Sequence, residues 1–134
     1  MIELFRKTGW NIDMIVPVPN SLARKRLRGY NQASLLALPI ALCMGIAYRP
    51  GALSKVRDTR SQVGLSTLER KRNVEGAFLA NKEMVSQRSI LVIDDIRTSG
   101  ATMEACATTL IDHGASQVYG LTLARAGLEN PVIQ

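Results

Sequence analysis

The sequence predicts an α/β domain with a mostly parallel central sheet and flanking helices. Ile90–Ile93 follows Ser89 as an uninterrupted apolar strand, which is typical of a central strand covered on both faces. A helix is predicted over Ala101–His113 and another strand over Val118–Leu123, so the order is strand, helix, strand. A chain of 134 residues has room for one such domain, and 46% hydrophobic and 21% charged residues are ordinary for a globule.

The composition excludes several classes of protein. No apolar stretch is long enough to span a bilayer, and the start of the chain lacks the pattern of a secretory signal. Cys43 and Cys106 are isolated and His113 is the single histidine, so a zinc ribbon, a disulfide framework and a multi-histidine metal site are not expected. We expect a cytoplasmic protein with both cysteines buried, and His113 complementing a helix dipole.

The first part of the chain predicts a buried strand and a helix. Met14–Val18 is apolar and stops at Pro19, after which a basic loop leads to Asn31, a suitable helix cap. Pro39 is expected to kink or interrupt the helix. Its apolar side is predicted to include Ala33, Leu35, Leu36, Leu38, Ala41 and Leu42.

The middle of the chain is less regular. Residues 48–51 predict a turn or sheet edge, and Leu53–Arg72 predicts a mobile loop with a helical turn at Ser66–Lys71. Ala77–Leu79 predicts a short strand, followed by a turn at Asn81–Lys82. The later helix is expected to end at Gly114 and to bury Met103, Ala107, Leu110 and Ile111. We divide the chain into an extension (1–13), a domain (14–127) and a tail (128–134).

The charge is unevenly distributed. The net charge is +6, but between Asn20 and Arg72 eleven basic side chains face two acidic ones, giving +9. This asymmetry points to an anionic partner, but a basic face that contacts only solvent explains it about equally well. Only Tyr30 and Tyr48 offer rings for base stacking there, so a polyphosphate is as suitable a partner as nucleic acid.

The strongest functional signal follows the central strand. Asp94 and Asp95 come at its carboxyl end, where open α/β sheets bind ligands. Thr98-Ser99-Gly100 then leads into a helix, whose N-terminus favours an anion. Gly100 has no side chain, so the backbone has room to close around an anion. The hydroxyls of Thr98, Ser99 and Thr102 add hydrogen-bond donors. Phosphate in the turn and a diol on the carboxylates together suggest a ribose 5-phosphate; the pattern is neither a Walker loop nor a dinucleotide fingerprint.

These residues also carry a family resemblance. Ile90–Thr102, ILVIDDIRTSGAT, resembles the phosphoribosyl-pyrophosphate (PRPP) motif of type I phosphoribosyltransferases. Ile15–Ala37, Arg57–Phe78 and Leu121–Ala126 resemble the ComF/GntX branch of that superfamily. The resemblance implies a five-stranded, mainly parallel sheet with a mobile loop over the site. Many members of the family carry a cysteine-rich zinc-binding segment before this domain. This sequence shows no such segment, and we expect no zinc-binding segment in the domain itself.

The resemblance implies a role for each part of the site. Asp94 and Asp95 would be catalytic and bind the ribose hydroxyls. The 5-phosphate would be bound by Thr98, Ser99, Gly100, Ala101 and Thr102. Pyrophosphate would be held by Pro19, Asn20, Ser21 and Arg24, and the flexible loop would contribute Lys55, Arg57 and Arg60. Arg97 is expected to face solvent. Mg²⁺ would be held through ligand oxygens and water rather than directly by the protein.

The implied activity is transfer of a phosphoribosyl group to a nucleobase or related acceptor, with release of pyrophosphate and a link to competence and DNA uptake. The sequence shows no recognisable hood for a base. A PRPP sensor without turnover, or an accessory protein that binds single-stranded DNA, therefore remains an alternative. A homodimer and a contact with the competence machinery are also left open.

Overall fold

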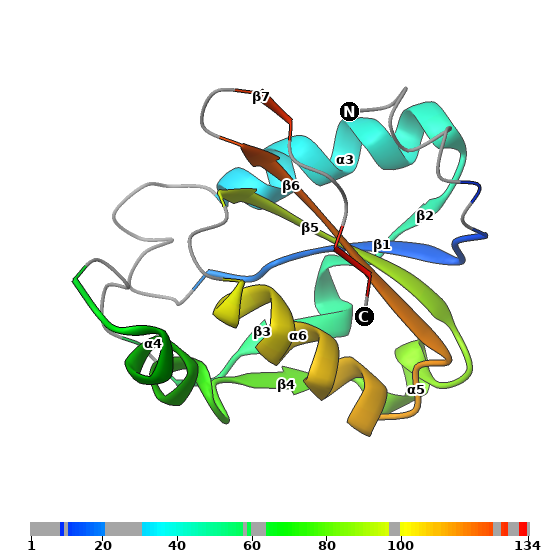
Figure 1. The fold of residues 1–134 in the computed structure, drawn as a ribbon. Coiled ribbons are helices and arrows are strands. Elements are labelled where there is room, and N and C mark those ends of the chain that lie inside the picture. Colours follow the sequence, from blue (N-terminus) through cyan, green and yellow to red (C-terminus); the bar gives the residue numbers. More distant parts are fainter. Residues whose placement is uncertain are drawn as a thin grey trace.

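A sheet with a parallel centre separates two helical layers (Figure 1). The computed structural model describes residues 9, 11–20, 31–57, 59, 64–96, 100–124, 127–128 and 132–133. The parallel strands lie in the order β2 (Ala47–Tyr48), β1 (Met14–Pro17), β5 (Ser89–Ile96) and β6 (Gln117–Ala124). This arrangement confirms the predicted α/β class.

Two short strands pair antiparallel to β6. They are β7 (Gly127–Leu128) and β8 (Val132–Ile133), which contact different stretches of the same strand. The second lies in the segment predicted to be a tail. In the part of the chain that the structure describes, no helix combines the length and the apolar character needed to cross a membrane.

Strand alternation creates two hydrophobic clusters. Ile15 and Leu91 face helix α3 (Gln32–Met44), whereas Val16 and Val92 face helix α6 (Ala101–Asp112) on the opposite side of the sheet. All four strand side chains are fully buried, as the two-residue period of a central strand requires. Each face of the sheet is thus covered by one long helix (Figure 1).

A smaller layer packs on the α6 side. It contains the antiparallel hairpin of β3 (Leu53–Lys55) and β4 (Phe78–Ala80), with a 3-10 turn η1 (Pro50–Ala52) before it. Helix α4 (Thr67–Val74) begins with a complete capping box between Ser66 and Glu69, as predicted. Helix α5 (Lys82–Val85) is capped by Asn81.

Two sequence predictions are corrected in this layer. Leu53–Lys55, expected in a loop, is a strand because its backbone pairs with residues 78–80, far away in sequence. The turn predicted at Asn81–Lys82 is the start of α5, since the Asn81 side chain accepts a hydrogen bond from the Met84 amide at 3.3 Å.

Helix α3 differs from its prediction in the face that it buries. Pro39 does not interrupt it. The buried positions are Ala33, Ala37, Ile40 and Ala41, whereas Leu35, Leu38 and Leu42 are exposed. Small residues on the sheet side let the helix approach closely, so the larger leucines lie on the opposite side. Cys43 is also exposed, contrary to expectation, while Cys106 is buried as predicted.

Helix α6 largely follows its prediction. Met103, Ala107 and Leu110 are buried, but Ile111 is 44% exposed because it points away from the sheet. His113 forms the C-cap, at the helix end where it was expected.

Candidate functional site

The ends of β1 and β5 bring two predicted site segments together. Pro17 pairs with Ile93, and the Val18 amide donates to the Ile93 carbonyl at 2.9 Å. Pro19 and Asn20 follow β1 directly, just as Asp94 and Asp95 follow this pairing on β5. Two separate segments therefore reach the same edge of the sheet, where ligands bind in open α/β folds.

The paired aspartates lie within β5, not beyond its end as predicted. The strand continues to Ile96, but its register with β6 shifts between Asp94 and Ile96. Such an irregularity inserts an extra residue and re-aims the neighbouring side chains. The Asp95 amide donates to Oδ1 of Asp94 at 2.8 Å, so the two residues form one local unit.

The environment of Asp94 favours its neutral form. The pKa of this carboxyl is raised from 3.8 to about 7, mainly by burial, with smaller contributions from a side-chain hydrogen bond with Asp95 and from the charge of Asp95. The hydrogen bond from the Asp95 amide opposes the shift. A side-chain hydrogen bond between two carboxyl groups needs a proton, so near neutral pH the pair holds one in a large fraction of molecules.

The predicted phosphate turn begins α6. Gly100 is the N-cap, with φ 80° and ψ −1°, a left-handed conformation that favours glycine. A Cβ built there meets no atom within 4 Å, so the backbone angle, not crowding, calls for glycine. Ala101 and Thr102 form the first turn of the helix, at the positive end of its dipole. Thr98 and Ser99, and Arg97, lie outside the described residues.

Asn31 joins the end of the basic loop to the end of β1. Its side-chain amide donates to the Val18 carbonyl at 3.1 Å, and its oxygen accepts from the Ala33 amide at 3.0 Å. One side chain thereby caps α3 and fixes the base of the predicted pyrophosphate loop. The sequence predicted only the cap, because nothing in it signals the long-range bond. Ser21 and Arg24 lie outside the described residues.

Lys55, which was predicted to belong to the flexible loop, acts electrostatically on a residue that the charge of Asp94 also affects. Burial raises the pKa of the Cys106 thiol, the charge of Asp94 raises it too, and the charge of Lys55 lowers it. Both charges therefore act on the same buried thiol. The Lys55 ammonium donates to Oγ1 of Thr59 at 2.9 Å and lies 5.9 Å from the centre of the Phe78 ring.

Arg57 has a different local role. Its Nη2 donates to the carbonyls of Asn73 and Glu75, at 2.9 and 2.5 Å, at the C-terminal end of α4. A guanidinium in that place satisfies carbonyls that the helix leaves unpaired. To reach pyrophosphate it would have to release both. Arg60 lies outside the described residues.

The donor atoms at the strand edge fit a Mg²⁺–phosphate ligand. Asp94 and Asp95 present oxygen only, which is the ligand type that Mg²⁺ prefers, and this ion keeps several waters or ligand oxygens of its own. Among the described residues, no group of three or more acidic, histidine or cysteine side chains is placed to hold a metal.

Comparisons with known proteins support this interpretation. No protein-family model matches the chain. It is 36% identical over 121 residues to DNA utilization protein YhgH of Salmonella typhimurium, which covers 90% of this chain and 53% of that protein. It is 32% identical over 116 residues to competence protein F of Haemophilus influenzae, covering 85% and 51%. The chain thus spans about half the length of the curated relatives it matches.

Solved structures with a similar fold include an adenine phosphoribosyltransferase and an amidotransferase that is named for PRPP. Adenine phosphoribosyltransferase from Saccharomyces cerevisiae is 18% identical, with a TM-score of 0.59, and the match covers 99% of this chain and 75% of that one. Glutamine PRPP amidotransferase from B. subtilis is 20% identical, also with a TM-score of 0.59, covering 90% and 24%. At these identities the likeness establishes the fold alone.

Proposed function

Since the chain belongs to the ComF family as a phosphoribosyltransferase-like domain, we propose that it binds PRPP with Mg²⁺ at the edge formed by β1 and β5. One observation carries the proposal. The register shift of β5 sets Asp94 and Asp95 side by side, and Gly100, the first described residue after β5, opens α6 in a left-handed turn. Carboxylates for a diol and a turn for a phosphate monoester are thus separated by one short loop.

Each part of PRPP has a matching chemistry. The turn from Thr98 to Thr102 binds the 5-phosphate with amides, hydroxyls and the helix dipole. Asp94 and Asp95 accept hydrogen bonds from the ribose 2′- and 3′-hydroxyls. Such bonds favour the charged carboxylate, so ligand binding lowers the raised pKa of Asp94 and releases its proton. The loop from Pro19 to Arg24 receives pyrophosphate.

The same residues suit phosphoribosyl transfer to an acceptor. The bond from C1 to pyrophosphate breaks, its electron pair leaves with pyrophosphate, and the acceptor forms the new bond to C1. Positive charge that develops on the ribose is stabilised by the negative potential of Asp94 and Asp95. Bound Mg²⁺ supplies neutralisation of the pyrophosphate oxygens. Lys55, at the end of β3, and the basic residues that follow it add to this neutralisation.

PRPP binding without turnover is the second candidate. Its support is the position of the chain after β6: β7 pairs back onto residues 123 and 124, and β8 onto 119 and 120, so these parts extend the sheet edge. We identify no described residues that would form a wall for a nucleobase over the site. In either case the names of the relatives support a role in DNA utilization or competence.

Isothermal titration calorimetry with PRPP and MgCl₂ tests the binding. We expect the Asp94→Asn/Asp95→Asn double variant to bind at least tenfold more weakly, since hydrogen bonds to charged carboxylates are replaced by weaker bonds to neutral amide oxygens, at a loss of about 1 kcal/mol or more each. Glu83→Gln, an exposed change on α5, is the control. Equal affinity of the double variant and the control would remove the ribose assignment.

A nucleobase panel separates the two candidates. Released pyrophosphate, measured with PRPP, Mg²⁺ and each base in turn, is expected for a transferase and not for a sensor. Release that persists in the Asp94→Asn/Asp95→Asn variant would show that the activity arises elsewhere.

A further inference from the structure

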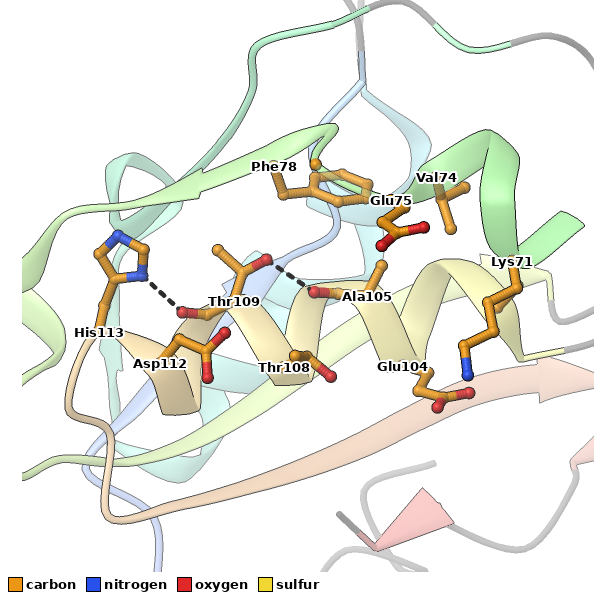
Figure 2. A pocket seen from close by; sticks show the side chains of 12 residues that line it. Lys71, Val74, Glu75, Phe78, Glu104, Ala105, Thr108, Thr109, Asp112 and His113 are labelled. Atoms are coloured by element: carbon orange, nitrogen blue, oxygen red, sulfur yellow. Dashed lines mark hydrogen bonds between the residues drawn. The ribbon is translucent and has the colours of Figure 1, made fainter.

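A groove of about 430 Å³ lies on the outer side of α6, between this helix, α4 and β4 (Figure 2). Its α6 wall follows one helical face, with Glu104, Thr108 and Asp112 four residues apart. Val74 and Phe78 contribute apolar surface from the opposite wall, and both are buried. The proposed PRPP site does not use these side chains, so the groove needs its own explanation.

The groove is acidic in a basic protein. Glu75, Glu104 and Asp112 line it, against one lysine, Lys71, which Figure 2 shows extending from α4 toward Glu104. Over the part of the chain that the structure describes, no ion pair is found for Glu75 or Asp112. The C-terminal end of α6, where Asp112 and the cap His113 lie, adds the negative end of the helix dipole, whereas the Ala101 end of the groove has the positive one. Three carboxylates against one lysine therefore favour a cation, most strongly at the Asp112 end of the groove.

The hydrogen-bonding groups there are mostly acceptors. Carboxylates only accept. The Thr109 hydroxyl donates to the Ala105 carbonyl at 2.8 Å, and Nδ1 of His113 is 2.7 Å from the Thr109 carbonyl, so both donors serve the helix itself (Figure 2). In a neutral ring this leaves Nε2 of His113 as a further acceptor. A ligand must bring donors, and an ammonium group has three donors and no acceptor.

We propose that this groove binds an aliphatic polyamine of the spermidine type. The apolar floor matches the methylene chain, and the acidic residues along its length match ammonium groups that are separated by such a chain. Ala101 to His113 spans about 18 Å of helix, which accommodates an extended molecule rather than a compact one. An anion is disfavoured by the net negative lining. The volume lies within the range of small-molecule pockets.

Calorimetry of the whole chain with spermidine, without PRPP, tests the proposal. We expect Glu104→Gln/Asp112→Asn to weaken binding about fivefold or more, the scale of losing two exposed charge contacts. Ala105→Leu fills the groove without changing charge and is expected to weaken it similarly. Glu83→Gln removes a carboxylate outside the groove and is expected to change nothing. Thermal melting shows whether each variant is folded.

Three results would overturn the proposal. One is no heat of binding for spermidine in the wild-type chain at about 0.15 M salt. Another is equal weakening by Glu83→Gln, which indicates diffuse attraction to surface carboxylates. The third is a tetralysine peptide that binds more tightly than spermidine, which indicates a basic protein segment as the occupant. PRPP affinity is measured on the same variants and is expected to be unchanged, so failure here leaves the proposed function standing.

Discussion

Asp94 is a carboxyl group whose protonation differs between the folded and unfolded chain. Its pKa is raised from 3.8 to about 7, chiefly by burial, so the folded protein holds more protons than the unfolded one between these values. Folding stability therefore falls as pH rises from about 4 to 7, with a slope of up to about 1.4 kcal/mol per pH unit from this group. Urea unfolding at several pH values is expected to show Asp94→Asn gaining stability relative to the wild type as pH increases. A difference that stays constant with pH would contradict the raised pKa.

Gly100 is required by its backbone angle. Because φ is 80° and space for a Cβ is open, Gly100→Ala is expected to cost about 1 kcal/mol of stability through strain alone. Relaxation of that strain rotates the amides of the phosphate turn, so PRPP affinity is expected to fall by more than tenfold in calorimetry. Gly51→Ala, at an open position with no positive φ, is the matched control. PRPP affinity that survives in Gly100→Ala would argue against the turn.

The sequence predicted some features of these residues and not others. Asp94, Asp95 and Gly100 lie within seven residues in a recognisable pattern, so the sequence alone could predict that a strand end and a helix start lie close together here. The register shift at Asp95 and the bond from Asn31 to Val18 were not, because both depend on which strand and loop become neighbours after folding. Arg57 was assigned to the flexible loop from the family resemblance, and its hydrogen bonds to helix carbonyls had no signal in the sequence.

At the scale of the element, the start of α3 depends on one side chain. Asn31→Ala removes both the cap and the bond to Val18, and is expected to lower the free energy of unfolding by about 2 kcal/mol. Asn31→Asp keeps the accepting oxygen but loses the donor, so it is expected to lower the free energy of unfolding by only about half as much. Chemical denaturation measures both. Equal losses in the two variants would show that the cap contributes nothing.

The packing of β6 on α6 depends on Gly120. A Cβ at this position comes within 2.8 Å of Sδ of Met103, a side chain that is 2% exposed and has little room to move. Gly120→Ala is therefore expected to destabilise by about 1–3 kcal/mol, the usual cost of overpacking. Combining it with Met103→Ala is expected to cost less than the sum of the single changes. Additive losses in denaturation would contradict this contact.

Elements were predicted best where the pattern was local. The strand at residues 89–93, the helix at 101–113 and the capping box at Ser66 all have signals in adjacent residues, and each is found. Of the β3–β4 hairpin, the strand predicted at Ala77–Leu79 is found one residue later as β4, but β3 and its pairing were missed because the strands are only three residues long and pair over 25 positions. The buried face of α3 was misjudged because close packing selected alanines over leucines.

Over the whole molecule, the charge distribution supports an anionic ligand without identifying it. The excess of +9 between Asn20 and Arg72 precedes the central strand, whose carboxyl edge gathers the proposed site. Much of that excess falls on positions 21–30 and 60–63, outside the described residues. The fold itself was predictable because one central β-α-β unit and the apolar strands around it determine it.

A crystal structure of the chain with PRPP and Mg²⁺ tests the central claim most directly. We predict the 5-phosphate in the turn at Gly100, and the ribose hydroxyls within hydrogen-bonding distance of Asp94 and Asp95. A PRPP molecule bound elsewhere, or a turn whose amides are taken up by the protein's own side chains while PRPP is in saturating excess, would contradict it.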